Sequence, residues 1–307
     1  MIIITELFRQ VLISILLKKE PDIIQRRIHM IQTSIQFQFQ TNDSNIRLVK
    51  GTNVNHNFPF HIHESFSLGI VEKGQRVIQL KSGEDFVISA QECFILNPNQ
   101  PHSCMTGEGE NHDYWVISIA PVLVYDVCNK ISGQGKGCVA TFPHVRITDP
   151  AIYRGFSAWI KKQTFNKPMN DDEFIKLLRN LISSHVVLST TPNPIQHSIV
   201  KDACDYIETN VNRVVRLNEI AEMTHASPFY LNRVFREEIG VPPYTYLLQT
   251  RIKKSIELLI KTDSITEAAF TLGFSDQSHF TRLFKKDVGI TPKQFLNINS
   301  INHPFVG

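Results

Sequence analysis

The chain has little cysteine, and its five cysteines form an odd number. No two of them are spaced as a Cys-x-x-Cys pair. This disfavours a zinc ribbon and a disulfide framework, so reduced thiols in a cytoplasmic protein are expected. We expect buried packing roles for them, with redox sensing by Cys93 or Cys104 as the alternative. The five are Cys93, Cys104, Cys128, Cys138 and Cys204.

The sequence also lacks a membrane-spanning pattern near its start. Residues 7–17 are largely apolar and are followed by Lys18 and Lys19, but a membrane helix needs about 20 apolar residues. The stretch has no basic leader or small-residue cleavage site, so it is a poor signal peptide. We expect no membrane segment. Residues 1–34 remain an extension of open status, either a helix or a stretch upstream of a true start at Met30.

Neither sign of charge dominates the chain. Lysine and arginine number 32 against 29 acidic residues, so the formal net charge is +3. A nucleic-acid surface would therefore be a local patch and not a property of the whole chain. With 42% hydrophobic and 20% charged residues, the 307 residues are typical of globular protein and suffice for two domains.

Two patterns divide the first two thirds of the chain. Residues 35–145 contain short strand-like runs separated by turn residues, which favours a β-sandwich or barrel. Residues 146–189 then show helical periodicity, over 150–163 and 171–188. These two helices either form a dimer seam or cover the sheet. Two prolines within residues 190–198 predict an extended linker, and everything after it has a helical pattern.

The strongest pattern is an internal repeat in the C-terminal third. Residues 235–240 (FREEIG) match residues 284–289 (FKKDVG), which begin 49 positions later. Upstream the offset is 48, and Ser227 then matches Ser275. A repeat of this length indicates a duplicated supersecondary unit. Other matched pairs are Leu217 with Ile265, Ala221 with Ala269, Leu231 with Phe280, Arg233 with Arg282, Pro243 with Pro292 and Tyr246 with Phe295.

Each copy contains the parts of a helix-turn-helix. We expect a short first helix over residues 217–224 or 265–272. The second helix of each copy is expected to stop at Gly240 or Gly289, because glycine accepts the left-handed conformation that ends a helix. Two such units in tandem predict a DNA-binding domain over residues 199–299.

The turn between the two helices has its own residue signals. Gly273 suits the left-handed position in the second copy, and His225 takes that position in the first. Ser227 and Ser275 are the expected N-caps of the second helices. Pro228 is favourable at the first helical position of the first copy.

The second helix of each copy has a polar stripe opposite its apolar one. Arginine can pair with guanine, and asparagine or glutamine with adenine, on major-groove edges, while lysine suits phosphates. A connecting helix of about eighteen residues would be about 27 Å long, which suits placing the two units in adjacent major grooves. The candidate DNA contacts are Phe229, Asn232, Arg233, Arg236, Gln277, Ser278, Thr281, Arg282, Lys285 and Lys286.

These motifs resemble the AraC/XylS family of bacterial transcription regulators. The resemblance rests on residues 272–286 (LGFSDQSHFTRLFKK) and 289–292 (GITP), on 227–235 (SPFYLNRVF), and on the connecting segment 251–259 (RIKKSIELL). Ser255 stands where alanine is usual. The resemblance implies that Phe229, Asn232 and Arg233 in one unit, and Gln277, Ser278, Thr281 and Arg282 in the other, take the family's DNA-contacting positions.

The N-terminal half more loosely resembles the cupin-like effector domain of such regulators. Cupin enzymes hold a metal with a His-x-His pair, a glutamate and a distal histidine, and here His61, His63 and His102 supply three imidazoles. The expected carboxylate is missing, because Ser67 or Leu68 occupies its place. We therefore expect no metal and no cofactor. The candidate effector-binding residues are His61, His63, Glu64, His102 and Trp115.

Together these patterns predict an α+β protein of two domains. The first is a cupin-like β-barrel with helices and the second an all-α domain with two helix-turn-helix units. We expect an effector-responsive transcription regulator, an activator in a bacterial cytoplasm, and not an enzyme. Its expected partners are double-stranded DNA, a small-molecule effector, RNA polymerase and a second copy of the chain. The alternative is a metal-dependent cupin enzyme with a DNA-binding tail.

Overall fold

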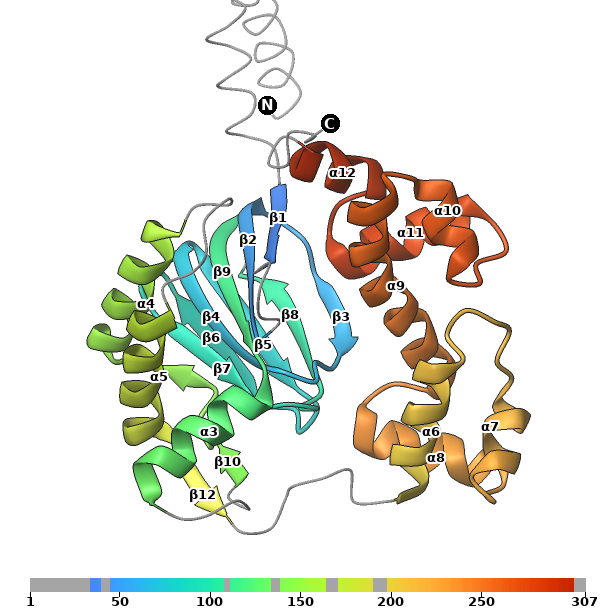
Figure 1. Ribbon diagram of the computed structural model, residues 1–307, viewed down its shortest axis with the longest axis horizontal. Helices are drawn as coiled ribbons and strands as arrows, with labels where there is room; N and C mark the ends of the chain where they lie inside the picture. The colour runs from blue at the N-terminus through green and yellow to red at the C-terminus, as the bar shows by residue number, and fades with distance from the viewer. Residues whose placement is uncertain are drawn as a thin grey trace, which may run out of the picture.

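The computed structural model describes residues 34–39, 45–107, 111–133, 139–163, 171–189 and 198–300. A β-rich N-terminal domain and a helical C-terminal domain lie side by side (Figure 1). The N-terminal extension up to residue 33 and the linker at 190–197 lie outside the described residues. No described helix is both long and apolar enough to cross a membrane.

Two large antiparallel sheets form most of the N-terminal domain. The larger has the strand order β1-β2-β9-β4-β7-β11 and the smaller β3-β8-β5-β6. The two sheets form an open, cupin-like arrangement, which is compatible with the cupin-like domain predicted from the sequence. The strands are β1 (Ser34–Phe39), β2 (Ile46–Val54), β3 (Phe58–His61), β4 (Phe66–Lys73), β5 (Gln75–Leu80), β6 (Asp85–Ser89), β7 (Cys93–Leu96), β8 (His102–Thr106), β9 (His112–Ile119) and β11 (Arg146–Ile147).

Three helices cover the outer face of the larger sheet (Figure 1). They are α3 (Pro121–Ser132), α4 (Pro150–Lys162) and α5 (Asp171–His185). Phe156 and Trp159 of α4 and Phe174 of α5 are fully buried against this sheet. The apolar sides of α4 and α5 therefore cover the sheet, and a role of these helices in dimerisation stays a prediction.

The end of the helical segment differs from the sequence prediction. The helix expected over residues 171–188 stops at His185, and Val187–Ser189 forms strand β12, which pairs with β10 (Val139–Thr141). The β-branched pair Val186 and Val187 favours an extended backbone at this point.

Cys93, Cys104, Cys128 and Cys204 are buried free thiols, and burial raises the pKa of Cys93 to about 12.

Seven helices follow in the described part of the C-terminal domain. Each helix-turn-helix unit consists of a short helix and a recognition helix, α7 with α8 and α10 with α11, and α9 runs between the two units (Figure 1). The helices are α6 (Ser198–Thr209), α7 (Leu217–Met223), α8 (Pro228–Ile239), α9 (Pro243–Thr262), α10 (Ile265–Thr271), α11 (Gln277–Val288) and α12 (Pro292–Ser300).

The turn and cap signals are confirmed with one correction. His225 and Gly273 both have a positive φ, of 52° and 74°. Ser227 caps α8 by accepting a bond from the backbone of Tyr230. The cap of α11 is Asp276 and not Ser275. The second turn is one residue longer, so the offset changes from 48 to 49 before this cap, and a carboxylate also suits the positive end of the helix.

A buried arginine ties the two units together. Arg251 of α9 is 5% exposed and donates hydrogen bonds to the carbonyl oxygens of Val211, Arg213 and Gly273 at 2.9, 2.7 and 2.8 Å. The first two carbonyls precede α7, and the third lies in the turn of the second unit. One side chain thus fixes both units to the connecting helix.

Candidate DNA-binding face and ligand cavity

Recognition helix α8 exposes most of its predicted DNA contacts. Phe229 is 81% exposed, although the opposite stripe, which contains Leu231 and Phe235, is fully buried. Arg233 and Arg236 are exposed and Asn232 is partly buried. An aromatic side chain left in water on a well-packed helix requires an explanation, and contact with a partner is one.

Recognition helix α11 presents a comparable polar face. Thr281 is partly buried, and Gln277 accepts a hydrogen bond from Thr266 of α10 at 3.1 Å. The structure therefore groups these residues by helix face as the sequence predicted. The exposed members of the predicted set are Gln277, Ser278, Arg282, Lys285 and Lys286.

A cavity of about 480 Å³ lies between the sheets and the C-terminal domain. This volume lies in the usual range for small-molecule sites. The inner faces of both sheets line it on one side, and α9 with the end of α11 lines it on the other. Both domains therefore contribute to one site. The sequence of the N-terminal domain alone does not indicate that residues of the C-terminal domain line this cavity.

One face of α9 joins the cavity to the N-terminal domain. Gln249, Lys253 and Glu257 are spaced four residues apart and share that face. Gln249 donates to the carbonyl of Phe60 at 2.8 Å, Lys253 pairs with Glu64 at 2.5 Å, and Glu257 pairs with Arg47 at 3.2 Å. The predicted effector residue Glu64 thus has an ion-pair partner in the other domain.

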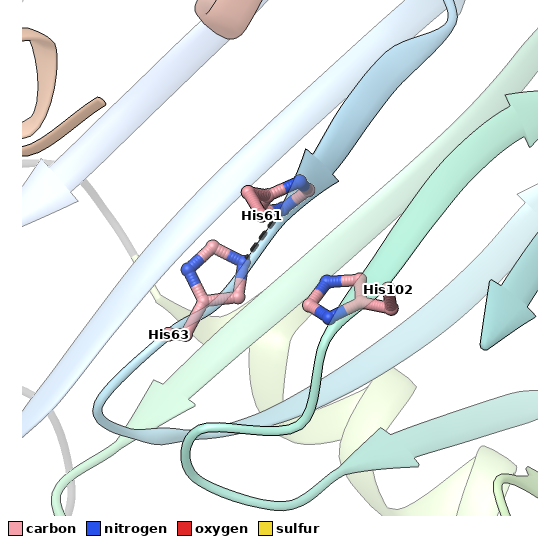
Figure 2. A group of neighbouring side chains, drawn as sticks. All are labelled: His61, His63 and His102. Atoms are coloured by element: carbon pink, nitrogen blue, oxygen red, sulfur yellow. Dashed lines mark hydrogen bonds between the residues drawn. The ribbon is translucent and has the colours of Figure 1, made fainter. Parts of the chain in front are cut away.

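Three histidines converge inside the cavity (Figure 2). His61 lies at the end of β3, His63 follows it, and His102 begins β8. One ring nitrogen of each lies within 4.8 Å of the others, and Nε2 of His61 lies 3.1 Å from Nε2 of His63. The sequence-predicted cluster is therefore brought together, and its three nitrogens could hold a metal or bind a ligand.

Backbone carbonyls set the tautomers of two of these rings. Nδ1 of His61 lies 2.6 Å from the carbonyl oxygen of Pro59, and Nδ1 of His102 lies 2.8 Å from that of Gln100. A carbonyl only accepts, so each Nδ1 carries a proton and each Nε2 of the neutral ring has a lone pair. Burial, followed by the effect of His102, lowers the pKa of His61 to about 4, and burial lowers that of His102 to about 4. Both rings are neutral at pH 7.

The aromatic wall of the cavity differs from the prediction. Tyr114 lines the cavity, whereas Trp115 does not and packs against the core beneath the covering helices. Successive residues of a strand point to opposite faces, so only one of this pair could face inward. The sequence prediction named Trp115, and the structure places Tyr114 at the cavity instead.

The sequence reasoning missed Arg76, which also lines the cavity. Its side chain is 5% exposed and donates to Nε2 of His112 at 3.0 Å. The available signal was alternation, because Arg76 shares the inward face of β5 with the buried Ile78. A charge in an inward position of a strand is unusual enough to mark a site.

Two family models match the chain. Residues 45–183 match an AraC-like ligand binding domain, and residues 220–298 match a helix-turn-helix domain. The HTH-type transcriptional regulator YbfI of Bacillus subtilis is 31% identical over 229 residues, which cover 72% of this chain and 81% of YbfI. The chain belongs to the AraC family of transcriptional regulators. It is a DNA-binding regulator with an N-terminal ligand-binding domain.

Two further comparisons describe a partial relative and a shared fold. The bifunctional transcriptional activator and DNA repair enzyme AdaA of Bacillus subtilis is 29% identical over 173 residues, which cover 56% of this chain and 69% of AdaA. Among solved structures, apo ToxT from Vibrio cholerae has a TM-score of 0.59 at 15% identity, with 84% of this chain and 98% of that chain covered. This likeness shows that the two-domain fold is shared.

Proposed function

We propose that a small molecule in the shared cavity controls how this regulator presents its two recognition helices to DNA. The observation that carries the proposal is that the cavity wall includes α9, the helix that connects the two units. A ligand that fits one placement of α9 better than another shifts the regulator toward that placement. A bound form of ToxT, which shares the fold, contains an unsaturated fatty acid.

The N-terminal domain contacts both recognition helices at equivalent points. Lys81 donates to the carbonyl oxygen of Glu237 near the end of α8, at 2.6 Å. Nε2 of His56 lies 2.7 Å from the carbonyl oxygen of Lys286 near the end of α11. Glu237 and Lys286 are 49 positions apart and therefore correspond in the repeat. These two contacts set the spacing of the helices as long as the domains remain docked.

The finer parts of the function follow from this mechanism. The proposed DNA contacts are the exposed polar faces of α8 and α11 described above. We propose that the regulator acts in the cytoplasm without catalysis, that it dimerises, and that it contacts RNA polymerase as an activator. The exposed sides of α4 and α5 are available for a second copy, since their apolar sides already cover the sheet.

Footprinting on the promoter regions of the chain's own gene and its neighbours tests the proposal. The wild-type chain should protect two adjacent major grooves. Lys81→Met should alter the protection of one half-site, because it releases the end of α8 without changing a predicted DNA contact. Lys130→Met, at the end of α3 in the N-terminal domain, is the matched control and should leave the footprint unchanged. An unaltered footprint for Lys81→Met would contradict control through domain docking.

A further inference from the structure

Arg76 is a buried cation without an acidic partner. Within the described residues, no carboxylate oxygen lies within the 4.0 Å ion-pair distance of its guanidinium. Its Nε atom is buried and has no hydrogen-bond partner. A buried charge is normally paired, since its loss of hydration is otherwise uncompensated. The side chain therefore lacks a counter-charge.

The contacts that Arg76 does make stabilise a cation without neutralising it. The guanidinium lies 4.1 Å from the ring centre of Tyr114, 5.4 Å from that of Phe58 and 5.8 Å from that of Phe94. Aromatic faces attract a cation through their quadrupole. His112 accepts one hydrogen bond through Nε2 and is neutral, because burial and then Arg76 lower its pKa to about 3. The guanidinium is thus held in place with its charge intact.

The acidic groups that line the cavity do not supply this counter-charge. Glu64 pairs with Lys253 and Glu257 pairs with Arg47. Asp287 at the end of α11 also lines the cavity, and burial raises its pKa to about 6. It is still largely ionised at pH 7, but none of its oxygens lies within ion-pair distance of Arg76. Among the described residues of the cavity wall, Arg76 is therefore the cation that no wall carboxylate pairs with directly.

We propose that the cavity binds an organic acid whose carboxylate pairs with Arg76 and whose body is apolar. The planar guanidinium matches a carboxylate in geometry as well as in charge. Apolar side chains supply the surface for a hydrocarbon or aromatic body, and both domains contribute them. This inference rests on the proposed effector role of the cavity and names the ligand class. Those side chains are Val49, Leu96, Val116, Ile252 and Ile256.

The same cavity favours an anion over a metal cation. His61, His63 and His102 have suitable nitrogens for a metal, but no carboxylate completes the set, since Glu64 is held by Lys253. A divalent cation would add its charge to that of Arg76 in one poorly hydrated space. A carboxylate would instead offset the charge that is already there.

Isothermal titration calorimetry on the full chain tests the ligand class. Octanoate, decanoate and phenylbutyrate are compared with the alcohols of the same carbon skeletons, and a zinc titration is run beside them. We expect at least one acid to bind, and its matched alcohol to bind at least about tenfold more weakly, since only the acid can form a charge-assisted pair. Equal binding of acid and alcohol, no binding of any acid, or stoichiometric zinc binding would overturn the inference.

Variants of Arg76 test whether the carboxylate of the ligand pairs with this side chain. Arg76→Met should remove the preference for acid over alcohol, and Arg76→Lys should retain part of it. Arg146→Gln, which removes an exposed ion pair with Glu92, is the control and should bind as the wild type does. If circular dichroism shows that Arg76→Met does not fold, Arg76→Lys and the wild type decide whether Arg76 causes the preference for acid over alcohol.

The proposed function and this inference fail separately. If an acid binds through Arg76 and the DNA footprint does not change, the effector role is wrong and the ligand class stands. If the footprint responds only to ligands without a carboxylate, the effector role stands and the ligand class is wrong.

Discussion

Gly240 and Gly289 occupy the same position in the two helix-turn-helix units, and both face the N-terminal domain. Each ends a recognition helix with a positive φ, of 87° and 92°. A Cβ added at Gly240 would lie 2.7 Å from Cβ of Pro101, and one at Gly289 would lie 2.8 Å from Cδ1 of Ile35. The repeat that builds the DNA-binding domain therefore also provides two matched points of contact with the N-terminal domain.

Alanine at either glycine should cost more than backbone strain alone. Gly133 ends α3 with a φ of 65°, and an added Cβ there would meet nothing within 4 Å. Gly133→Ala should therefore lower the free energy of unfolding by about 1 kcal/mol through strain alone. Gly240→Ala and Gly289→Ala should cost about 1–3 kcal/mol more, because the added methyl group also clashes across the domain contact. Urea unfolding compares the three, and equal costs would contradict the docked arrangement.

The buried Arg251 should be essential for the stability of the C-terminal domain. Arg251→Met keeps much of the side chain's volume but leaves three carbonyl groups without their donor. We expect a loss of about 2–4 kcal/mol in the free energy of unfolding. Lys254→Met is the comparison, since Lys254 on the same helix is exposed and donates to a single carbonyl, that of Glu208. Similar losses for the two variants would mean that the three bonds do not hold the units together.

Much of this architecture is predictable because local chemistry specifies it. The repeat, the glycine stops and the left-handed His225 follow from conformational preferences that act within a few residues. The cap of α11 was misplaced by one residue, because Ser275 and Asp276 are both good caps and the turn length decides between them. The sequence pattern thus predicted the helices better than their first residues.

The ligand cavity is less predictable because it depends on contacts between distant segments. The three histidines are recognisable as a motif, but the choice of Tyr114 over Trp115 depends on the register of β9. The missing partner of Arg76 is a property of the whole cavity wall, including α9, which lies more than 160 residues later in the chain. No local pattern shows that a charge will be buried without its opposite.

Acid should destabilise the protein through His102. Its pKa is lowered to about 4 from an ordinary value of 6.5, so below pH 6.5 the unfolded chain takes up protons that the folded chain does not. This contribution to stability is complete above pH 6.5 and is lost as the pH falls toward 4. The side chain is 2% exposed, and the shift corresponds to about 3 kcal/mol at most.

His102→Asn tests this pH dependence, because asparagine can still donate to the carbonyl of Gln100. Urea unfolding between pH 4 and 7 should show a shallower loss of stability in the variant than in the wild type. Asp287, whose pKa is raised, contributes with the opposite sign in part of this range, but it is present in both proteins and cancels in the comparison. Parallel pH profiles would contradict a buried neutral His102.

The two matched arginines should carry sequence readout. Arg233 and Arg282 are exposed at equivalent places of α8 and α11, and Arg233 also pairs with Glu237 of its own helix at 3.0 Å. If each contacts a base, its replacement by alanine should weaken binding to the specific site by about 1–3 kcal/mol and random DNA by less. Because Glu237 competes for Arg233, Glu237→Gln should strengthen specific binding slightly.

We expect Lys285, which is exposed on α11, to contact a phosphate, and its replacement is therefore compared with that of the arginines. Lys285→Ala should weaken binding to all sequences nearly equally, and it should reduce the slope of log affinity against log salt by about 1, because one fewer counterion is released. Arg282→Ala should instead change the preference among bases. Fluorescence anisotropy on specific and scrambled duplexes at several salt concentrations measures both quantities. If Arg282→Ala behaved as Lys285→Ala does, Arg282 would be a phosphate contact and base readout by α11 would fall to its remaining polar residues.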